Sequence, residues 1–280
     1  MAKDDRGDTD PSRGVIIVVR RSSKAEHLLS SGSARITAPS NTIDARIRGR
    51  SPSLHPIKMP LTLLSAGSNA HGQLGHSETE DSHTFQPCNF EGFPPGTLPE
   101  GTTEIVNLAT GANHTIIALR REKVELWACG DGRAGQLGSW PPLGDSERTD
   151  VFRRLVLLMD GKEFEGFEVK NVAAGWETTY VVLSPPKVVE QAQNDVVLSM
   201  GADDWGDLGV GGKGAGKSKK NVNSEKRAWN RVAYDQVPEL EGRRPFRVTQ
   251  IVAKQRHVLM LLLEVGTGRT WLIGWGAGRH

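Results

Sequence analysis

The chain has few cysteines and no long hydrophobic run, and each shortage excludes a class of protein. Its 280 residues include only Cys88 and Cys129, too few for the disulfide framework of a small secreted protein. The longest apolar runs, Val15–Val19 and Val258–Leu263, fall far short of the roughly 20 residues that a membrane-spanning helix needs. We therefore expect a protein without a membrane segment, located in the reducing cytoplasm, with the nucleus as a second location.

The body of the chain, residues 59–280, has no excess of positive charge, unlike a protein that coats nucleic acid. Residues 1–58 hold 11 of the 35 lysines and arginines and 6 of the 33 acidic residues, so residues 59–280 carry a net charge of −3. A DNA-coating surface needs many cations to pair with phosphates. The charge distribution therefore does not favour direct nucleic-acid binding.

Residues 1–58 lack a sustained hydrophobic period of 2 or 3.6, and they are rich in Ser, Arg, Gly and Asp. This composition predicts a disordered N-terminal extension. The arginines would suit a mitochondrial transit peptide, but such peptides avoid acids, and four aspartates lie within the first ten residues. A third interpretation is that translation begins at Met59 and that the extension is non-native.

Glycine is abundant, with 32 residues, and much of it lies in a repeated pattern. Complete copies of G-x4-G-x-L-G each follow an apolar stretch and occupy residues 67–75, 130–138 and 201–209; a fourth copy begins with Trp271. Between them lies a second signature, two apolar strands joined by a turn, at residues 105–119, 169–183 and 248–262. Two motifs in a fixed order indicate a repeat architecture. The units start near residues 61, 124, 195 and 270.

The repeat units have the composition of small antiparallel sheets. Short β-branched and aliphatic runs between Gly, Asn and Asp turns predict strands, and one such unit cannot bury both of its faces. We therefore expect an all-β fold, an open and partial β-propeller of about three to four antiparallel blades over residues 59–280. The leucine between two glycines of each loop, at 74, 137 and 208, would fill the space under the loop. The repeat glycines would supply positive-φ turns or close backbone approach; they are Gly67, Gly72, Gly75, Gly130, Gly135, Gly138, Gly201, Gly206, Gly209 and Gly276.

The two alternating motifs resemble the regulator of chromosome condensation repeat over residues 61–280. That resemblance implies a propeller of about seven blades, so a chain with three complete units and a fragment is expected to lack C-terminal blades. Within the family, residues 60–69 and the long inserts are similar to fungal alpha-tubulin suppressor-like proteins. This implies a non-enzymatic, protein-binding scaffold that needs no cofactor. It would support Elongator-dependent tRNA wobble-uridine modification and diphthamide synthesis through a small CSL zinc-finger partner. The family also implies an alternative, a guanine-nucleotide exchange factor for a small GTPase.

A rival motif occurs in the insert after the third loop. Gly211–Ser218 satisfies G-x4-G-K-[ST], the phosphate-binding P-loop, with Gly216, Lys217 and Ser218 as its nucleotide-binding residues. A P-loop needs a strand running directly into it and a helix after it. Here a whole repeat loop precedes the motif, and no apolar stripe follows it. The basic insert Lys213–Arg231 is better explained as a solvated loop than as a contact to RNA or to an acidic protein, since Trp229 is its single candidate for base stacking.

Candidate partner-binding residues lie at variable loop positions, where propellers display binding groups. They are Trp140, Trp176, Asp203, Asp204 and Trp205, and each tryptophan has packing inside a blade as its alternative. His71, His76 and His83 match no metal-binding spacing and are interpreted as ordinary loop histidines. His114 and His257 begin strands at equivalent repeat positions, which indicates a structural hydrogen bond within each blade. No catalytic residue or metal ligand is expected.

Overall fold

The described part of the chain is almost entirely β-structure. The computed structural model describes the backbone of residues 16–21, and in full residues 61–138, 148–157, 164–189, 192–210, 229–243 and 245–277. Within these residues, the strands form four antiparallel sheets, here called blades 1 to 4, and a single 3-10 turn, η4 (Tyr234–Gln236), interrupts them.

In blades 2 to 4, neighbouring strands follow one another along the chain. Blade 1 contains β1 (Ile16–Arg21), β2 (Leu61–Gly67) and β3 (Ser82–Pro87). Blade 2 contains β4 (Glu104–Thr110), β5 (His114–Arg120), β6 (Val124–Asp131) and β7 (Arg148–Leu155). Blade 3 contains β8 (Glu168–Ala174), β9 (Thr178–Ser184), β10 (Val196–Gly201) and β11 (Asn230–Arg231). Blade 4 contains β12 (Phe246–Lys254), β13 (His257–Glu264) and β14 (Thr270–Gly276).

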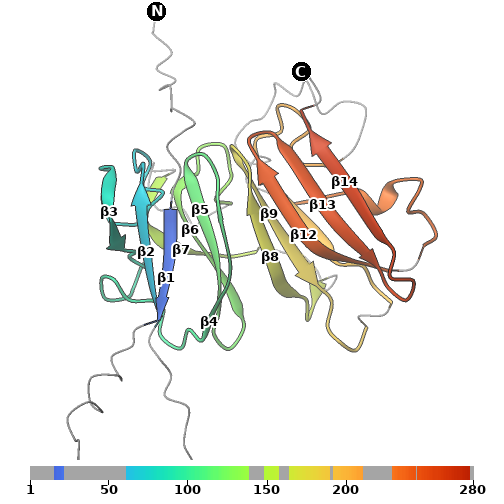
Figure 1. The fold of residues 1–280 in the computed structure, drawn as a ribbon, viewed down its shortest axis with the longest axis horizontal. Helices are drawn as coiled ribbons and strands as arrows, with labels where there is room; N and C mark the ends of the chain where they lie inside the picture. The colour runs from blue at the N-terminus through green and yellow to red at the C-terminus, as the bar shows by residue number, and fades with distance from the viewer. Residues whose placement is uncertain are drawn as a thin grey trace, which may run out of the picture.

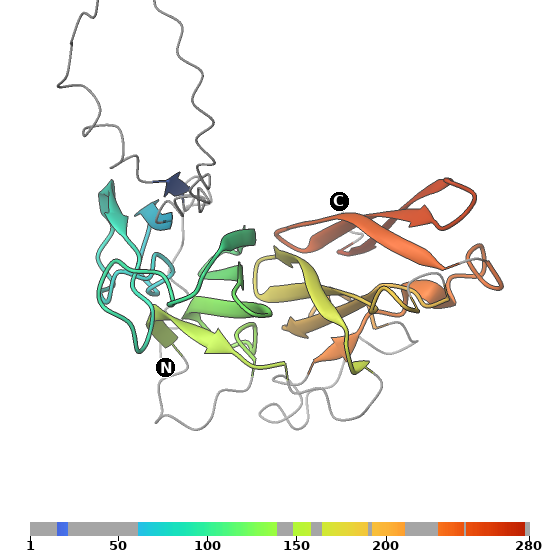
Figure 2. The same cartoon turned by 90° about the horizontal axis from the view of Figure 1, so that it is seen from below.

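The four blades lie side by side in an open arc, with β3 at one end and β14 at the other (Figure 1; Figure 2). The first strand of blade 3, β8, lies against the first strands of both neighbours, β4 and β12. This is the order in which a propeller arranges its inner strands. The arrangement confirms the predicted all-β fold, an open and partial β-propeller.

Blade 1 differs from the others in the origin of one strand. Strand β1 pairs antiparallel with β2, from Ile16 opposite Ala66 to Arg21 opposite Leu61. In blades 2 to 4, the same place is taken by β5, β9 and β13, each of which directly precedes its partner strand in the chain. The structure thus forms a strand at residues 16–21, where the composition predicted none, while the rest of 1–58 lies outside the described residues.

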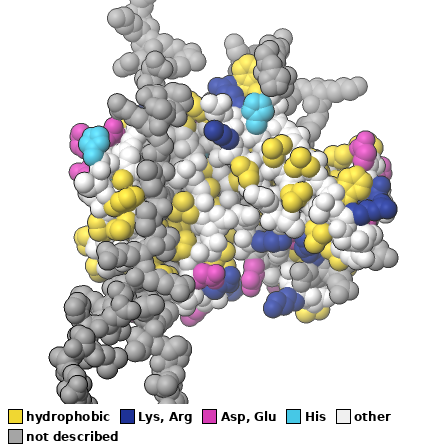
Figure 3. Space-filling model, viewed as in Figure 1, with side chains coloured by type: hydrophobic (Ala, Val, Ile, Leu, Met, Phe, Trp, Pro, Cys, Tyr) yellow, Lys and Arg dark blue, Asp and Glu magenta, His cyan; other side chains and the backbone are white. Residues whose placement is uncertain are grey.

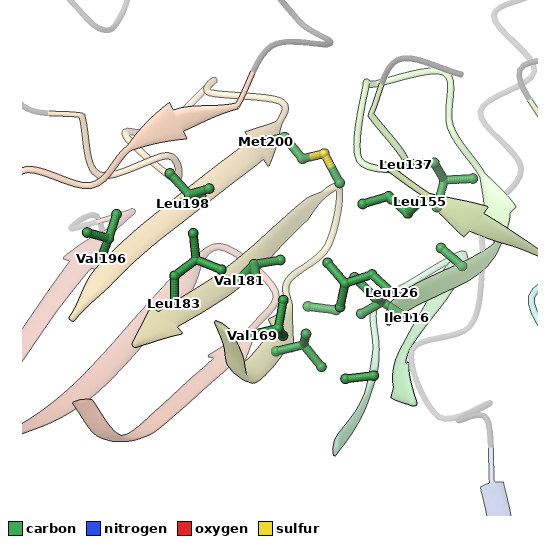
Figure 4. Close-up of a cluster of buried hydrophobic side chains, with 14 residues drawn as sticks. Ile116, Leu126, Leu137, Leu155, Val169, Val181, Leu183, Val196, Leu198 and Met200 are labelled. Atoms are coloured by element: carbon green, nitrogen blue, oxygen red, sulfur yellow. The ribbon is translucent and has the colours of Figure 1, made fainter. Parts of the chain in front are cut away.

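The core lies between the blades rather than inside any one of them. Successive side chains of a strand point to opposite faces, so a strand buried on both faces joins two clusters. In β9, Val181 and Leu183 pack against blade 2, whereas Tyr180 and Val182 pack against blade 4. Figure 4 shows the first of these clusters, in which Ile116 and Leu126 face Val181 and Met200. Each blade thus buries its apolar surface only against a neighbour.

Strand register makes the repeat equivalence explicit. Gly130 pairs with His114, Gly201 with Thr178, and Gly276 with His257. Two residues in different blades are therefore equivalent when they lie the same number of positions from these paired residues. The inner strands β4, β8 and β12 also carry a register shift at the same place, just before Asn107, Asn171 and Gln250 respectively.

Candidate functional site

The repeat loops are compact turns built over a buried leucine. In the first loop, the Gly72 amide donates to the Asn69 carbonyl at 2.8 Å, and the Gly75 amide donates to the Gly72 carbonyl at 3.0 Å. The second loop repeats both bonds, from the Gly135 amide to the Gly132 carbonyl and from the Gly138 amide to the Gly135 carbonyl. All three loop leucines are buried. All ten repeat glycines named from the sequence have positive φ. The loops are therefore rigid platforms and not flexible linkers.

Each loop is also fixed by a donor from the next blade. The Thr115 hydroxyl of blade 2 donates to the Gln73 carbonyl of the first loop at 2.7 Å, and the Thr179 hydroxyl of blade 3 donates to the Gln136 carbonyl at 2.7 Å. Blade 4 has Val258 at the threonine position, and there the Trp275 indole Nε1 donates to the Asp207 carbonyl at 2.8 Å. The same loop carbonyl thus accepts a hydrogen bond from the next blade in all three cases, twice from a threonine hydroxyl and once from an indole.

The last glycine of a loop allows this close approach. A Cβ on Gly138 would lie 3.2 Å from Met200 Sδ, and a Cβ on Gly209 would lie 2.8 Å from Trp275 Nε1. Met200 and Trp275 are equivalent positions, one residue before the first glycine of the following repeat. The glycine is therefore required by packing between blades as well as by its φ angle.

The sequence predicted that His114 makes a structural hydrogen bond within its own blade. In the structure, His114 instead bonds to the neighbouring blade. Its Nε2 lies 2.9 Å from the Thr179 hydroxyl. That hydroxyl gives its proton to the Gln136 carbonyl, so we infer that the imidazole is the neutral tautomer that donates from Nε2. Burial lowers the pKa of His114 to about 4. Its repeat counterpart His257 occupies the equivalent register position but is exposed, so the two histidines do not share the same buried environment.

The three histidines of the first repeat have different environments and do not form a cluster. His76 is buried and its Nε2 lies 2.7 Å from the Ser65 hydroxyl, while His71 Nδ1 lies 3.6 Å from Asp131 Oδ2. His83 is exposed on β3. Across the fully described ranges, no three His, Cys, Asp or Glu side chains gather in a way that could hold a metal ion.

The third loop presents an acidic and aromatic tip. Asp203 supports the loop from inside, because its Oδ1 accepts the Leu208 amide at 3.0 Å, as Asn69 Oδ1 accepts the Leu74 amide at 2.9 Å in the first loop. Asp204 and Trp205 are exposed. Asp204 and Trp205, two of the three residues predicted to bind a partner here, are therefore accessible to a partner. The third, Asp203, stabilises the loop conformation.

Blade 4 contributes a cation that the sequence analysis missed. The guanidinium of Arg256, in the β12–β13 turn, lies 5.1 Å from the centre of the Trp205 ring. A sequence signal existed: Lys254–His257 departs from the glycine-containing turns of the other units. The backbone there adopts an unusual conformation, with Gln255 at φ 48°.

The turn of blade 3 lies next to that of blade 4. The Trp176 amide donates to the Gln255 carbonyl at 2.7 Å, and the half-buried Trp176 side chain belongs to this turn. At the base of the third loop, the Ala202 amide donates to the Glu177 carbonyl at 3.0 Å. The structure thus brings Trp176, Asp204, Trp205 and Arg256 to one edge of the arc, and we call these four residues the tryptophan rim.

A buried acid lies under the rim. The Asp207 side chain is buried and its Oδ1 has no hydrogen-bond partner. Burial raises the pKa of Asp207 to about 6; Asp203 and Asp204 act in the same direction, and Arg256 opposes it. Burial also raises the pKa of Asp203. The acid beneath the rim is therefore held in its protonated form to a higher pH than an ordinary aspartate.

The other predicted residues are not among those that the structure places at the rim. Trp140 and the P-loop-like segment with Gly216, Lys217 and Ser218 fall outside the described residues. Trp229, considered as a base-stacking residue, instead packs against the apolar cluster between blades 2 and 3. In the described part of the chain, none of the helical structure has the length and apolar character needed to cross a bilayer.

Comparison with known proteins gives two curated relatives. No protein-family profile matches the chain. An RCC1 repeat-containing protein of Schizosaccharomyces pombe is 29% identical over 163 residues, which cover 58% of this chain and 39% of the relative. A secretion-regulating guanine nucleotide exchange factor of Bos taurus is 28% identical over 148 residues, which cover 53% of this chain and 26% of the relative. The match therefore spans less than half the length of either relative.

Solved structures give weaker similarities. Human WBSCR16 aligns with a TM-score of 0.49 and 19% identity, covering 76% of this chain and 48% of that one. Yeast Prp20p aligns with a TM-score of 0.48 and 17% identity, covering 73% and 40%. The family prediction rests on the repeat motifs and the curated relatives. The similarity to a named RCC1 repeat-containing protein confirms that this chain resembles the family of regulator of chromosome condensation repeats.

Proposed function

We propose that this chain is a non-enzymatic scaffold that binds another protein through the tryptophan rim. The observation that carries this proposal is Trp205, which is 41% exposed at the tip of a loop whose base is fixed by Trp275. Exposed aromatic residues on rigid supports lose little entropy on binding and often dominate an interface. Arg256 and Asp204 add charges of both signs around the ring.

The partner that we propose is a small CSL zinc-finger protein. The similarity of residues 60–69 and the long inserts to fungal alpha-tubulin suppressor-like proteins supports it. In that role the chain would serve Elongator-dependent tRNA wobble-uridine modification and diphthamide synthesis, in the cytoplasm. A scaffold needs only a binding surface for this work, and the exposed Trp205 and Asp204 support the rim as that surface.

Calorimetry with a purified CSL zinc-finger protein tests the proposal. We expect Trp205→Ala to weaken binding by about 30-fold or more, as loss of an aromatic anchor does. Val188→Ala is the matched control, since Val188 is also exposed but lies in the turn after β9, away from the rim. Equal affinities of the two variants would place the interface elsewhere.

A guanine-nucleotide exchange factor is the second candidate. The name of the Bos taurus relative favours it. Release of a fluorescent guanine nucleotide from a panel of small GTPases separates the two functions. Acceleration by the wild-type chain, and not by Trp205→Ala, would favour exchange activity over a passive scaffold.

A further inference from the structure

The third repeat loop departs from the other two at one buried position. The residue after the second glycine is Gln73 in the first loop, Gln136 in the second and Asp207 in the third, and all three are buried. Gln73 Oε1 accepts the His71 amide at 2.9 Å. Gln136 Oε1 accepts the Ala134 amide at 3.0 Å in the same way. Glutamine at this position therefore satisfies an amide of its own loop.

Asp207 does not take over this role. Its side chain is one methylene shorter than that of glutamine, and its Oδ1 is buried with no hydrogen-bond partner. Its carbonyl, by contrast, accepts the Tyr180 hydroxyl at 2.6 Å and the Trp275 Nε1 at 2.8 Å. The third loop is thus anchored through the backbone of Asp207. A buried carboxylate oxygen without a partner is unfavourable for folding, and such exceptions to a local rule are typical of functional positions.

The charges around Asp207 show which way its carboxylate faces. Burial has the largest effect and raises the pKa of Asp207; Arg256 lowers it, and Asp203 and Asp204 raise it. Interactions between charges weaken with distance, so the carboxylate faces these residues of the loop tip and of the β12–β13 turn. Three carboxylates therefore act on the space under the tryptophan rim, and the guanidinium of Arg256 only partly opposes them. This space favours a further positive group.

Trp205 adds an aromatic ring that already contacts a cation. The ring is 41% exposed, and the Arg256 guanidinium lies 5.1 Å from its centre. Figure 3 shows Lys, Arg and His side chains beside hydrophobic ones at the upper edge of the arc, the edge where the β12–β13 turn lies in Figure 1. The face of an indole ring attracts ammonium and guanidinium groups. The rim thus combines two features that attract a cation, an aromatic face and a buried carboxylate.

We propose that Trp205 and Asp207 together bind the ammonium group of a lysine that belongs to a protein partner. This inference rests on the proposed function, because the lysine is part of the protein that the tryptophan rim binds. The ammonium donates to Asp207 Oδ1, and the methylene stem of the lysine lies against the Trp205 ring.

Lysine suits this site better than other cations. Its charge is compact, which fits a position where the side chain is one methylene shorter than in the other loops, whereas a guanidinium is a larger, planar group. A metal ion fits less well, because no three His, Cys, Asp or Glu side chains of the described residues come together to hold one.

Blocked tripeptides test the site without the partner. Glycyl-lysyl-glycine and glycyl-norleucyl-glycine, both acetylated and amidated, differ only in the ammonium group. Each is titrated into the isotope-labelled full chain, and the indole N–H resonance of Trp205, identified by its loss in Trp205→Phe, is followed by NMR. The lysine peptide should shift this resonance saturably and bind at least about fivefold more tightly than the norleucine peptide. Equal affinities, or no shift with either peptide, would overturn the proposal.

Substitutions at Asp207 separate a binding role from a structural one. Asp207→Gln restores the residue of the other two loops, so it should stabilise the folded chain and weaken binding of the lysine peptide at least about fivefold. Asp207→Asn removes the charge alone and should weaken binding similarly. Glu104→Gln is the matched control, since it removes a half-exposed carboxylate of blade 2 and should leave the affinity unchanged. Wild-type affinity in Asp207→Gln would contradict the site.

The outcome also separates this inference from the proposed function. If the CSL zinc-finger protein binds in a Trp205-dependent way and the lysine peptide has no preference over norleucine, the proposed function stands and the lysine site is wrong. If lysine-selective binding requires Asp207 and the CSL zinc-finger protein does not bind, the lysine site stands and the proposed partner is wrong.

Discussion

The interface between blades 2 and 3 and the interface between blades 3 and 4 join the same repeat positions by different chemistry. The first is mainly apolar, and its polar side-chain contacts are neutral: His114 donates to Thr179, Thr179 donates to Gln136, and the Asn107 amide donates to Asn171. The second contains a buried carboxylate, Asp195, whose oxygens lie 2.9 Å from Lys170 Nζ and 3.4 Å from Arg247 Nη1. A propeller of this type therefore fixes the geometry of each interface and leaves its chemistry free to vary.

Removing the buried carboxylate from the charged interface should cost more stability than removing an exposed ion pair. Asp195→Ala leaves Arg247 and Lys170 without that carboxylate and should lower the free energy of unfolding by about 3–5 kcal/mol. Asp235→Ala is the control, since Asp235 pairs at 2.8 Å with the half-exposed Arg231 and should cost less than about 1 kcal/mol. Urea denaturation measures both. Similar losses would remove the distinction between the two interfaces.

The neutral interface should instead be sensitive to acid. The folded state holds His114 neutral with its pKa near 4, while the unfolded chain takes up a proton below its ordinary value of 6.5. Stability from this group is therefore present above pH 6.5 and falls by as much as about 3 kcal/mol as the pH drops to 4. Denaturation midpoints at pH 7 and 4.5 should differ less in His114→Asn than in the wild type. His257→Asn, changed at an exposed histidine, should keep the wild-type pH dependence.

The threonine that joins blades 2 and 3 allows a smaller test. Thr179→Val keeps the shape of the side chain and removes both hydrogen bonds of its hydroxyl, which should cost about 1–3 kcal/mol because the Gln136 carbonyl and His114 remain buried. Thr249→Val loses a 3.1 Å bond to the Leu261 carbonyl on an exposed strand and should cost under about 1 kcal/mol. If thermal unfolding gives the two variants the same midpoint, the hydroxyl does not hold the interface.

The smallest effect concerns the acid beneath the tryptophan rim. The pKa of Asp207 is raised to about 6, so the folded state disfavours its ionised form at neutral pH. Asp207→Asn should therefore stabilise the protein above pH 6, by on the order of 1 kcal/mol, and the gain should disappear below about pH 4. Unfolding curves at pH 8 and 4 provide the comparison. A variant less stable than the wild type at pH 8 would contradict the assignment.

The repeat could be predicted from sequence because its determinants are local. A glycine such as Gly201 is needed where its Cβ would lie 2.1 Å from the Glu177 carbonyl oxygen, and φ is +120°. No other residue type fits such a place, so the pattern is visible in one chain. The rim was predicted only in part. Trp205 could be predicted because it is an aromatic residue at a variable loop position, whereas Arg256 contacts the Trp205 ring only because blades 3 and 4 lie side by side.

The sequence by itself determined the number and order of the units, the places where glycine is required and the apolar strands between them. The tertiary structure decided which faces are buried and which remain open. Phe85 and Phe152 are the same residue type in the same position of successive repeats, yet one is half exposed and the other fully buried. The difference lies in the presence of a neighbouring blade, because apolar burial depends on what packs against a side chain and not on the side chain alone.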